Sequence, residues 1–407
     1  MSDRDWFEAL PDGWSAAPLG YHFEVVLGKM INASKDNGDG ELAPYLAAGS
    51  IQPEMLLLDE EKRMSLTPAE LEQYDLRERD VVVVEGGAGY GRSHLLRESL
   101  PGWGFQNHVA RVRARGVADP GFVDYGLKAC LASGFIEANN RTATLPSLSR
   151  DVLRSLRMPT PPLSEQRAVA DYLDRETAQI DTLIDEQEHL IDLLRERREA
   201  VGAQYFASSS GKRLTTVRRV LRPLARPAVP GLGVITAYRD GAVTLRSNRR
   251  DDGYTFSDTE HGYQEIRRGD LVFHALDGFA GAIGISDSHG NATPVYHVCE
   301  ATNGDDPAYV AMLLRYLGVT GFLVTQAPNV RERSVDFRNW SMLARIPLAL
   351  PTATEQSRAV EEIVILTAKI DLLIAESERF IELARERRSA LITAAVTGKI
   401  DVREDVA

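Results

Sequence analysis

The sequence predicts an α+β protein in which two mixed α/β globules alternate with two long helices as a pseudo-twofold internal repeat. Three observations predict this fold class. Two segments match each other at a constant offset of 190 positions. Both carry a heptad pattern of apolar residues, which is typical of a coiled coil. The stretches before them are rich in Gly and Pro and hold only short β-branched runs, which indicates compact globules.

The internal repeat is clearest between residues 165–200 and 355–390. The run Arg195–Arg198 (RERR) recurs unchanged as Arg385–Arg388. A weaker match at the same offset aligns the strand-like RERDVVVV with RRGDLVFH. A period of this length is far too long for a solenoid unit. We therefore expect a duplicated module, each copy consisting of a globule and a helix.

The copied segments predict two long helices that pair antiparallel. In the first helix the expected seam is formed by Leu173, Ile180, Leu194 and Val201, with Leu183, Ile184, Leu190 and Ile191. In the second it is formed by Ile363, Ile370, Ala384 and Leu391, with Leu373, Ile374 and Phe380. The alternative is two amphipathic helices on separate cores, but helices of about 40 residues rarely lie on one small globule.

These patterns divide the chain into four segments. They are a first globule (1–158), a first long helix (159–206), a second globule (207–345), and a second long helix with a C-terminal tail (346–407). Within the globules, short helices are expected near residues 121–133 and 307–318.

Composition excludes several classes of protein. The 407 residues carry a net charge of −12, which excludes a uniformly basic coat for nucleic acid. The N-terminus lacks the features of a signal peptide, and no apolar run approaches the roughly 18 residues of a membrane span. Only Cys130 and Cys299 are present, which excludes a disulfide framework and a cysteine-rich zinc site. We expect a soluble cytoplasmic protein.

No catalytic or metal-binding pattern is found. The glycine run Gly86–Gly91 follows a strand-like VVVV but lacks the GK[ST] ending of a phosphate loop and the spacing of a dinucleotide fingerprint. A tight turn is the better interpretation. The histidines show no HExxH or other metal spacing, and no GxSxG motif occurs. The sequence therefore predicts a protein that is not an enzyme.

Basic residues cluster within both globules. Arg111, Arg113 and Arg115 alternate along an expected strand, and residues 212–340 carry 16 basic and 14 acidic residues. Arginine suits phosphate contacts, and Arg and Asn can read base edges. Any single one is more often solvated surface charge. The candidate DNA contacts are Arg92, Asn107, His108, Arg141, Arg246, Asn248, Arg249, Arg331 and Arg333.

Taken together, the chain resembles the specificity (DNA-recognition) subunit of type I restriction-modification systems. The resemblance is carried by PPLSEQRAVADYLDRETAQIDTLIDEQEHLIDLLRERREA at 161–200 and by AAVTGKID at 394–401. GFQNHVARVR at 104–113 and GDLVFHALDGFAGAIG at 269–284 look like parts of its target-recognition domains. The resemblance covers essentially the whole chain.

The resemblance implies a non-catalytic subunit that binds double-stranded DNA. Each recognition domain would read one half of a bipartite target, and the helices would set the spacer and dock two methyltransferase (modification) subunits. Restriction/translocase subunits would join that core. The chain itself would hold no cofactor, whereas S-adenosylmethionine, and ATP with magnesium, would belong to the partners. The arginines expected at the helical docking surface are Arg195, Arg197, Arg198, Arg385, Arg387 and Arg388.

Two other functions compete with that of a specificity subunit. A fused methyltransferase would need a loop for S-adenosylmethionine and an [ND]PP[FYW]-type motif, which Pro159–Pro162 does not supply. A coiled-coil scaffold with carbohydrate- or protein-binding heads would have no role on DNA. Sequence-specific DNA binding that depends on a methyltransferase partner would separate these functions from a specificity subunit.

Overall fold

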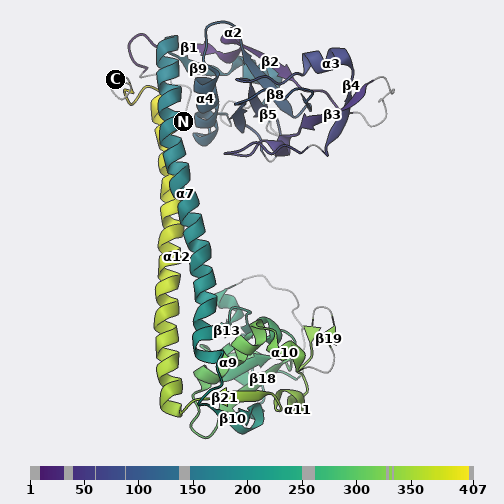
Figure 1. Ribbon diagram of the computed structural model, residues 1–407, viewed down its shortest axis with the longest axis vertical. Helices are drawn as coiled ribbons and strands as arrows, with labels where there is room; N and C mark the ends of the chain where they lie inside the picture. Colours follow the sequence, from purple (N-terminus) through teal and green to yellow (C-terminus); the bar gives the residue numbers. More distant parts are fainter. Residues whose placement is uncertain are drawn as a thin grey trace. The chain divides into compact units, whose positions relative to one another are not determined.

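The computed structural model describes residues 10–31, 40–59, 61–87, 89–136, 147–249, 262–326, 330–331 and 334–402. The chain divides into two compact units. Unit 1 comprises Met1–Glu188 with Arg379–Ala407, and unit 2 comprises His189–Glu378. Two helices of 44 residues, α7 (Leu163–Phe206) and α12 (Ala353–Val396), each contribute one part to each unit (Figure 1). None of the described helices has both the length and the apolar character that crossing a lipid bilayer requires.

The globule of unit 1 is built on an antiparallel sheet with the strand order β2-β8-β5-β6. These strands are β2 (Phe23–Leu27), β5 (Val81–Val84), β6 (Ser93–Leu95) and β8 (Val109–Ala114). Both faces of β5 are buried, because Val81 and Val83 pack in one apolar cluster while Val82 and Val84 pack in another. The first cluster includes helix α4 (Pro120–Ala132), which covers that face of the sheet. A continuous valine run suits such a fully buried strand.

The remaining elements of this globule surround the sheet. They are β1 (Ser15–Pro18), α2 (Leu19–His22), β3 (Glu41–Leu46), η1 (Ala48–Ser50), β4 (Arg63–Leu66), α3 (Pro68–Gln73), β7 (Gly104–Phe105), α6 (Arg150–Ser155) and β9 (Arg157–Thr160). β1 pairs with β9, and β4-β3-β7 form a second, three-stranded sheet. Between β5 and β6, Gly87 and Gly91 have φ angles of 89° and 82°, and the Gly91 N–H donates to the Val84 carbonyl. Gly87 and Gly91 therefore lie in a tight turn.

The globule of unit 2 contains a sheet of the same plan, with the strand order β11-β18-β15-β16. These strands are β11 (Leu221–Pro223), β15 (Leu271–His274), β16 (Ile283–Ile285) and β18 (Tyr296–Ala301), and helix α9 (Pro307–Val319) shares an apolar cluster with this sheet. The other elements are β10 (Arg213–Thr216), α8 (Val217–Val220), β12 (Ile235–Ala237), β13 (Val243–Leu245), η2 (Arg246–Asn248), β14 (Gln264–Ile266), η3 (Gly278–Ala280), β17 (Gly290–Ala292), α10 (Phe322–Thr325), β19 (Val330–Arg331), β20 (Ser334–Val335), α11 (Trp340–Leu343) and β21 (Pro347–Leu350).

The internal repeat is thus present in the fold as well as in the sequence. β5 and β15, β6 and β16, and α7 and α12 all begin 190 residues apart. The short helices predicted near 121–133 and 307–318 are confirmed as α4 and α9, and each begins with a proline after an aspartate N-cap. The predicted fold class, with two mixed globules alternating with two paired long helices, is confirmed.

The two long helices pack antiparallel within each unit. In unit 1 the shared apolar core contains Val169, Ala170 and Leu173 of α7 and Ile392, Ala395 and Val396 of α12. In unit 2 it contains Leu194, Val201 and Phe206 of α7 and Ala359, Ile363 and Ile370 of α12. The start of each helix therefore packs with the end of the other.

The predicted seam is wrong at four positions. Leu183, Leu190, Leu373 and Phe380 are between 39% and 47% exposed. The seam of α7 instead follows alternating spacings of four and three residues through Ile180, Ile184, Gln187, Ile191, Leu194, Arg198 and Val201. Because Gln187 and Arg198 are polar, counting apolar residues favours the neighbouring stripe of leucines. Each helix has one partner helix along this stretch, so that second stripe stays at the surface.

We predict that Ile180→Asp destabilises the protein by roughly 3 kcal/mol, because it places a carboxylate without a partner in an apolar seam. Ile180 is only 6% exposed, whereas Leu183, on the same helix, is 45% exposed. Leu183→Asp is therefore the matched control and should change the free energy of unfolding by less than about 1 kcal/mol. Urea unfolding of both variants measures this difference. An equal loss of unfolding free energy in the two variants would show that the seam does not run through Ile180.

Candidate nucleic-acid interface

Three of the four candidate residues in the first globule meet at one end of β5. The Val84 N–H donates to the Arg92 carbonyl and the Glu85 N–H to the His108 carbonyl, each at 2.8 Å. Arg92 and His108 thus flank β5 on opposite sides, with Asn107 beside His108. The His108 side chain is 55% exposed and its Nδ1 lies 3.5 Å from a Glu85 carboxylate oxygen. This end of the sheet presents donor groups to solvent. Arg141 lies outside the described residues.

Gln52 belongs to the same group, although no sequence motif marks it. Arg92 Nη1 donates to Gln52 Oε1 at 3.2 Å, and Gln52 Nε2 donates to the Gly49 carbonyl at 2.7 Å. Gln52 begins a tight turn that is closed by its N–H donating to the Met55 carbonyl. A separation of 40 residues between Arg92 and Gln52 hides this contact from any local motif. The bond holds the Arg92 guanidinium in a defined position.

In the second globule, Arg246, Asn248 and Arg249 lie together in and just after η2. Asn248 Nδ2 donates to Thr244 Oγ1 at 2.8 Å, which fixes the amide on the preceding strand β13. The Arg249 guanidinium lies over the Tyr238 ring, 4.7 Å from its centroid, and 2.7 Å from a carboxylate oxygen of Asp240.

The contacts of Asp240 affect its ionisation. Burial opposes the charged form, but the Ala242 N–H and the Arg249 guanidinium hold the pKa of Asp240 below its usual value. The arginine is therefore held by one aromatic and one ionic contact, on the hairpin of β12 and β13. Of the remaining candidates, Arg331 ends strand β19, while Arg333 lies outside the described residues.

The expectation that Arg111 and Arg113 reach phosphate is wrong. Only 4% of the Arg111 side chain is exposed, and its Nη1 donates to Asp75 Oδ1 at 2.7 Å. Arg113 binds Asp80 at 2.7 Å and Asp75 at 3.0 Å. The reason is the position of β8, which pairs on both edges, with β2 and β5, and has residues packed in both apolar clusters. Its side chains therefore point into the globule, and the two arginines form a largely buried ionic cluster.

The arginines of the repeated RERR run take part in pairing the helices. In unit 2, Arg195 lies 3.6 Å from Glu378 and Arg198 lies 2.6 Å from Asp371. In unit 1, the equivalent residues Arg385 and Arg388 lie 3.0 Å from Glu188 and 2.8 Å from Asp181. Each pair maps onto its counterpart at the offset of 190. Four of the six arginines expected to bind a partner protein thus have an intramolecular role.

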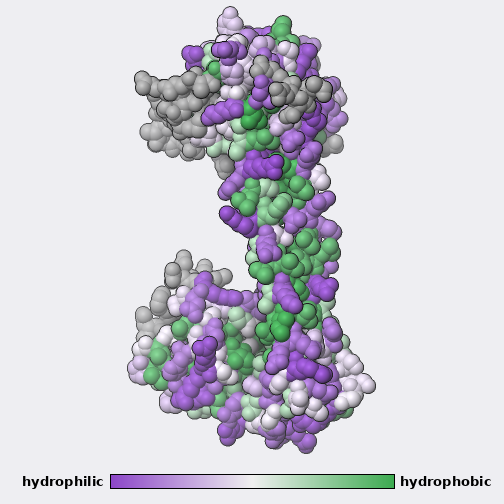
Figure 2. Space-filling view, turned by 90° about the vertical axis from the view of Figure 1, so that its left-hand side faces the viewer, coloured by the Kyte–Doolittle hydropathy of each residue, from purple (hydrophilic) through white to green (hydrophobic). Residues whose placement is uncertain are grey.

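The remaining two arginines and a set of leucines face solvent. Arg197 and Arg387 are exposed and make no ion pair with any residue that the structure describes. Three large apolar side chains are exposed at equivalent positions of the helix pair in both units, and Val364, Ile365 and Leu372 are exposed in unit 2 alone. Figure 2 shows hydrophobic surface on the long helices. The residues at equivalent positions are Leu183, Phe380 and Leu383 in unit 1, and Leu373, Leu190 and Leu193 in unit 2.

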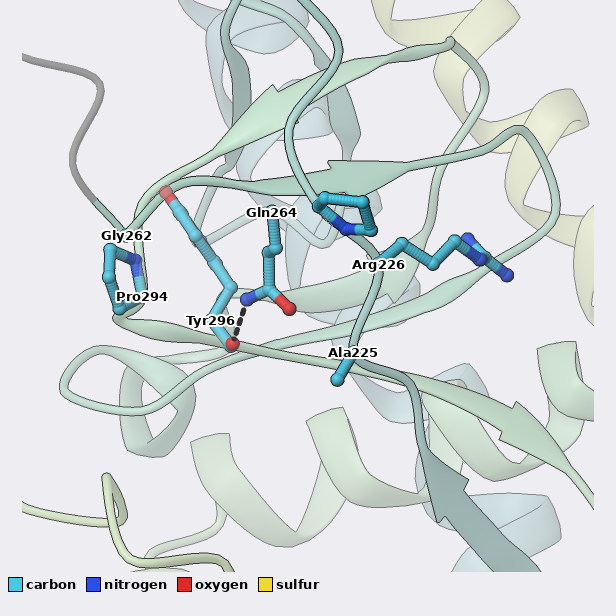
Figure 3. A pocket seen from close by; sticks show the side chains of 7 residues that line it. Ala225, Arg226, Gly262, Gln264, Pro294 and Tyr296 are labelled. Carbon is cyan, nitrogen blue, oxygen red and sulfur yellow. Dashed lines mark hydrogen bonds between the residues drawn. The ribbon is translucent and has the colours of Figure 1, made fainter.

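A hollow of about 420 Å³ lies in the second globule and is lined by Ala225, Arg226, Pro227, Gly262, Gln264, Pro294 and Tyr296 (Figure 3). Its polar groups bind one another or neighbouring residues. Gln264 Nε2 donates to the Tyr296 carbonyl at 2.7 Å, and the Arg226 guanidinium forms a bidentate ion pair with Asp270. Among the residues that the structure describes, the lining of the hollow presents no nucleophile or acid–base pair.

No protein-family model matches the sequence, and no curated protein matches it. Solved structures do match. A chain from a structural study of complex assembly and conformational transition in the type I R-M system is 13% identical, with a TM-score of 0.73, over 96% of this chain and 100% of that one. The HsdS subunit from Thermoanaerobacter tengcongensis is 14% identical, with a TM-score of 0.60, over 96% of this chain and 98% of that one. At these identities the likeness shows a shared fold.

The buried cluster around Arg113 predicts an acid-sensitive contribution to stability. Burial opposes ionisation of Asp75, but hydrogen bonds from Arg113 and Arg77 hold its pKa below the usual 3.8. A lowered pKa in the folded state stabilises the fold above the unfolded-state pKa of about 3.9, and this contribution is lost as the pH falls through the folded-state value. Asp75→Asn should therefore be less stable than the wild type at pH 7, and the difference should shrink below about pH 4. Urea midpoints from pH 7 to pH 3 measure it, and a constant difference would contradict the assignment.

Proposed function

We propose that the chain is the specificity subunit of a type I restriction-modification system, a non-catalytic protein that binds double-stranded DNA. The observation that carries the proposal is the duplicated plan: each unit joins one sheet-and-helix globule, with exposed basic and amide groups, to one end of an antiparallel helix pair. Two such globules on one chain suit a DNA target that consists of two half-sites. The structural likeness to a type I R-M chain and to an HsdS subunit supports this proposal.

Recognition is assigned to residues 1–158 and 207–345. In the first globule the candidate readers are Arg92, Asn107 and His108, together with Arg141. In the second they are Arg246, Asn248 and Arg249, together with Arg331 and Arg333. Arginine binds guanine and asparagine binds adenine through paired hydrogen bonds, each worth about 1–3 kcal/mol of discrimination. Because each globule has its own apolar core, each should read its half-site independently.

Residues 159–206 and 346–407 are assigned to spacing and to assembly. A helix of 44 residues measures about 66 Å at 1.5 Å per residue, and its length would set the spacer between half-sites. The equivalent triplets of exposed apolar residues, one in each unit, suit two copies of one methyltransferase subunit. Arg197 and Arg387 are the arginines best placed to contact it, since the other four already bind across the helix pair.

The partners would supply the chemistry and part of the DNA clamp. S-adenosylmethionine would be bound by the methyltransferase subunits, and ATP with magnesium by the restriction/translocase subunits. The first long helix with its flanks, residues 159–211, carries five basic and eleven acidic residues, so it contributes little attraction for phosphate. The net charge of −12 fits a reader that depends on its partners for much of the electrostatic affinity.

We predict that the purified chain alone shows neither methyl transfer nor tight sequence-specific binding, and that both arise when the modification subunit of the same system is added. Incorporation of a radiolabelled methyl group and duplex binding measured by fluorescence anisotropy provide the two readouts. Methyl transfer by the highly purified chain alone would favour a fused methyltransferase. Assembly without any effect on DNA binding would favour a scaffold.

We predict that Phe380→Asp and Leu190→Asp, which occupy equivalent positions of the two units, each reduce the number of bound modification subunits from two to one. A charged group in an apolar contact removes the favourable burial and is itself desolvated. The double variant should bind none. Native mass spectrometry counts the subunits, and Leu214→Asp, which alters a 78% exposed residue in the second globule, is the control. Two subunits bound to the double variant would place the docking surface elsewhere.

A further inference from the structure

Two buried glutamines occupy the same place in the two units. Gln166 is the fourth residue of α7 and is 5% exposed, and Gln356 is the fourth residue of α12 and is 0% exposed. They stand 190 residues apart, in register with the repeat. A primary amide buried at this depth is costly unless its hydrogen-bonding groups are satisfied.

Each glutamine joins its long helix to the core helix of the globule in the same unit. Gln166 Oε1 accepts from the Asp119 N–H at 2.8 Å, and Gln356 Oε1 accepts from the Asp306 N–H at 2.8 Å. Asp119 is the N-cap of α4 and Asp306 is the N-cap of α9. The backbone at the start of each core helix is thus tied to the first turn of each long helix.

The amide nitrogen of each glutamine binds the segment that leads into the long helix. Gln166 Nε2 donates to the Pro161 carbonyl at 2.8 Å, and Gln356 Nε2 donates to the Pro351 carbonyl at 3.0 Å. Gln356 Nε2 also lies 2.8 Å from Asp305 Oδ1, a contact without a counterpart in unit 1, where Ala118 occupies the equivalent position. One side chain therefore fixes three chain segments against each other.

The other polar links between globule and helix differ between the units. In unit 1, Asp174 of α7 binds Arg97 at 2.8 Å and the Tyr125 hydroxyl at 2.7 Å. The equivalent of Asp174 in α12 is Val364. In unit 2, Ser357 donates to Asp306 at 3.0 Å. Among the residues that the structure describes, the glutamine amide is the polar link that both units retain.

We propose that Gln166 and Gln356 are positioning residues that hold each recognition globule at one angle on its long helix, and thereby let the complex discriminate between spacer lengths. Tilting a globule would break buried hydrogen bonds without replacing them by water, so the angle is strongly preferred. The inference rests on the proposed function, because a spacer matters only for a bipartite target.

The test uses the complex assembled with the modification subunit. Methylation rates are measured on duplexes with the sequence found by mapping methylated sites in cells, and on duplexes whose spacer is one base pair longer or shorter. Gln166→Leu and Gln356→Leu should each lower the ratio of correct-spacer to altered-spacer rates at least fivefold. The preference for bases within each half-site should not change.

Val298→Ala is the control, because it creates a cavity in the sheet of unit 2, where Val298 is 1% exposed, away from the glutamine. It should lower stability and leave the spacer ratio as in the wild type. If the leucine variants fail to fold, Gln166→Glu and Gln356→Glu replace them. Both variants keep the acceptor oxygen and lose the donor, but only Gln356→Glu places a second carboxylate beside Asp305. At neutral pH, Gln356→Glu should therefore lower the ratio of correct-spacer to altered-spacer rates more than Gln166→Glu does.

Two outcomes would overturn the inference alone. A uniform fall in rate with an unchanged spacer ratio would give the glutamines a purely structural role. If Val298→Ala lowered the spacer ratio as much as the leucine variants do, the effect would come from general loosening of the globule. A wild-type complex that methylates all spacers equally would overturn the proposed function, and this inference with it.

Discussion

Both units are built on the antiparallel seam of α7 and α12. Long helices of this kind gain their stability from packing rather than from helix propensity. The apolar seam supplies burial, and the half-buried Arg388, paired with Asp181, fixes the register because a shifted helix would leave charges unpaired. The same pairing between Arg198 and Asp371 follows from the repeat. A single duplicated sequence thus specifies both halves of the seam.

Some polar residues of the globules form buried ion pairs, while others are exposed at the surface. In the first globule both faces of the central strands are covered, so Arg111 and Arg113 neutralise buried carboxylates and are withdrawn from solvent. The candidate DNA contacts stand at strand ends and turns, such as the exposed His108 beside Glu85 and Arg249 beside Asp240. Loops positioned by a rigid scaffold are where binding residues concentrate. This distribution explains how a chain with excess negative charge can still present local groups of donors.

Much of the architecture could be predicted from the sequence, because the offset of 190 residues and the heptad spacing are strong periodic signals. The helices at 120–132 and 307–319 could be located approximately for a different, local reason: an Asp-Pro pair, which suits a helix start, stands at the beginning of each. The register of the seam could not be predicted, because Gln187 and Arg198 occupy seam positions and a count of apolar residues does not include them. Nor could the contact of Arg92 with Gln52 be found, since it joins segments that only the folded sheet brings together. The roles of Gln166 and Gln356 depend on burial, which a sequence pattern does not reveal.

We propose that two recognition globules, each reading its own half-site, share one pair of long helices. Exchanging residues 212–345 for the matching segment of a related chain, and mapping the methylated sites of cells that carry the intact and the exchanged system, tests this proposal most directly. We expect a bipartite target in both cells, with one half replaced, the other half retained and the spacer unchanged. A single undivided target, or an exchange that alters both halves, would contradict it.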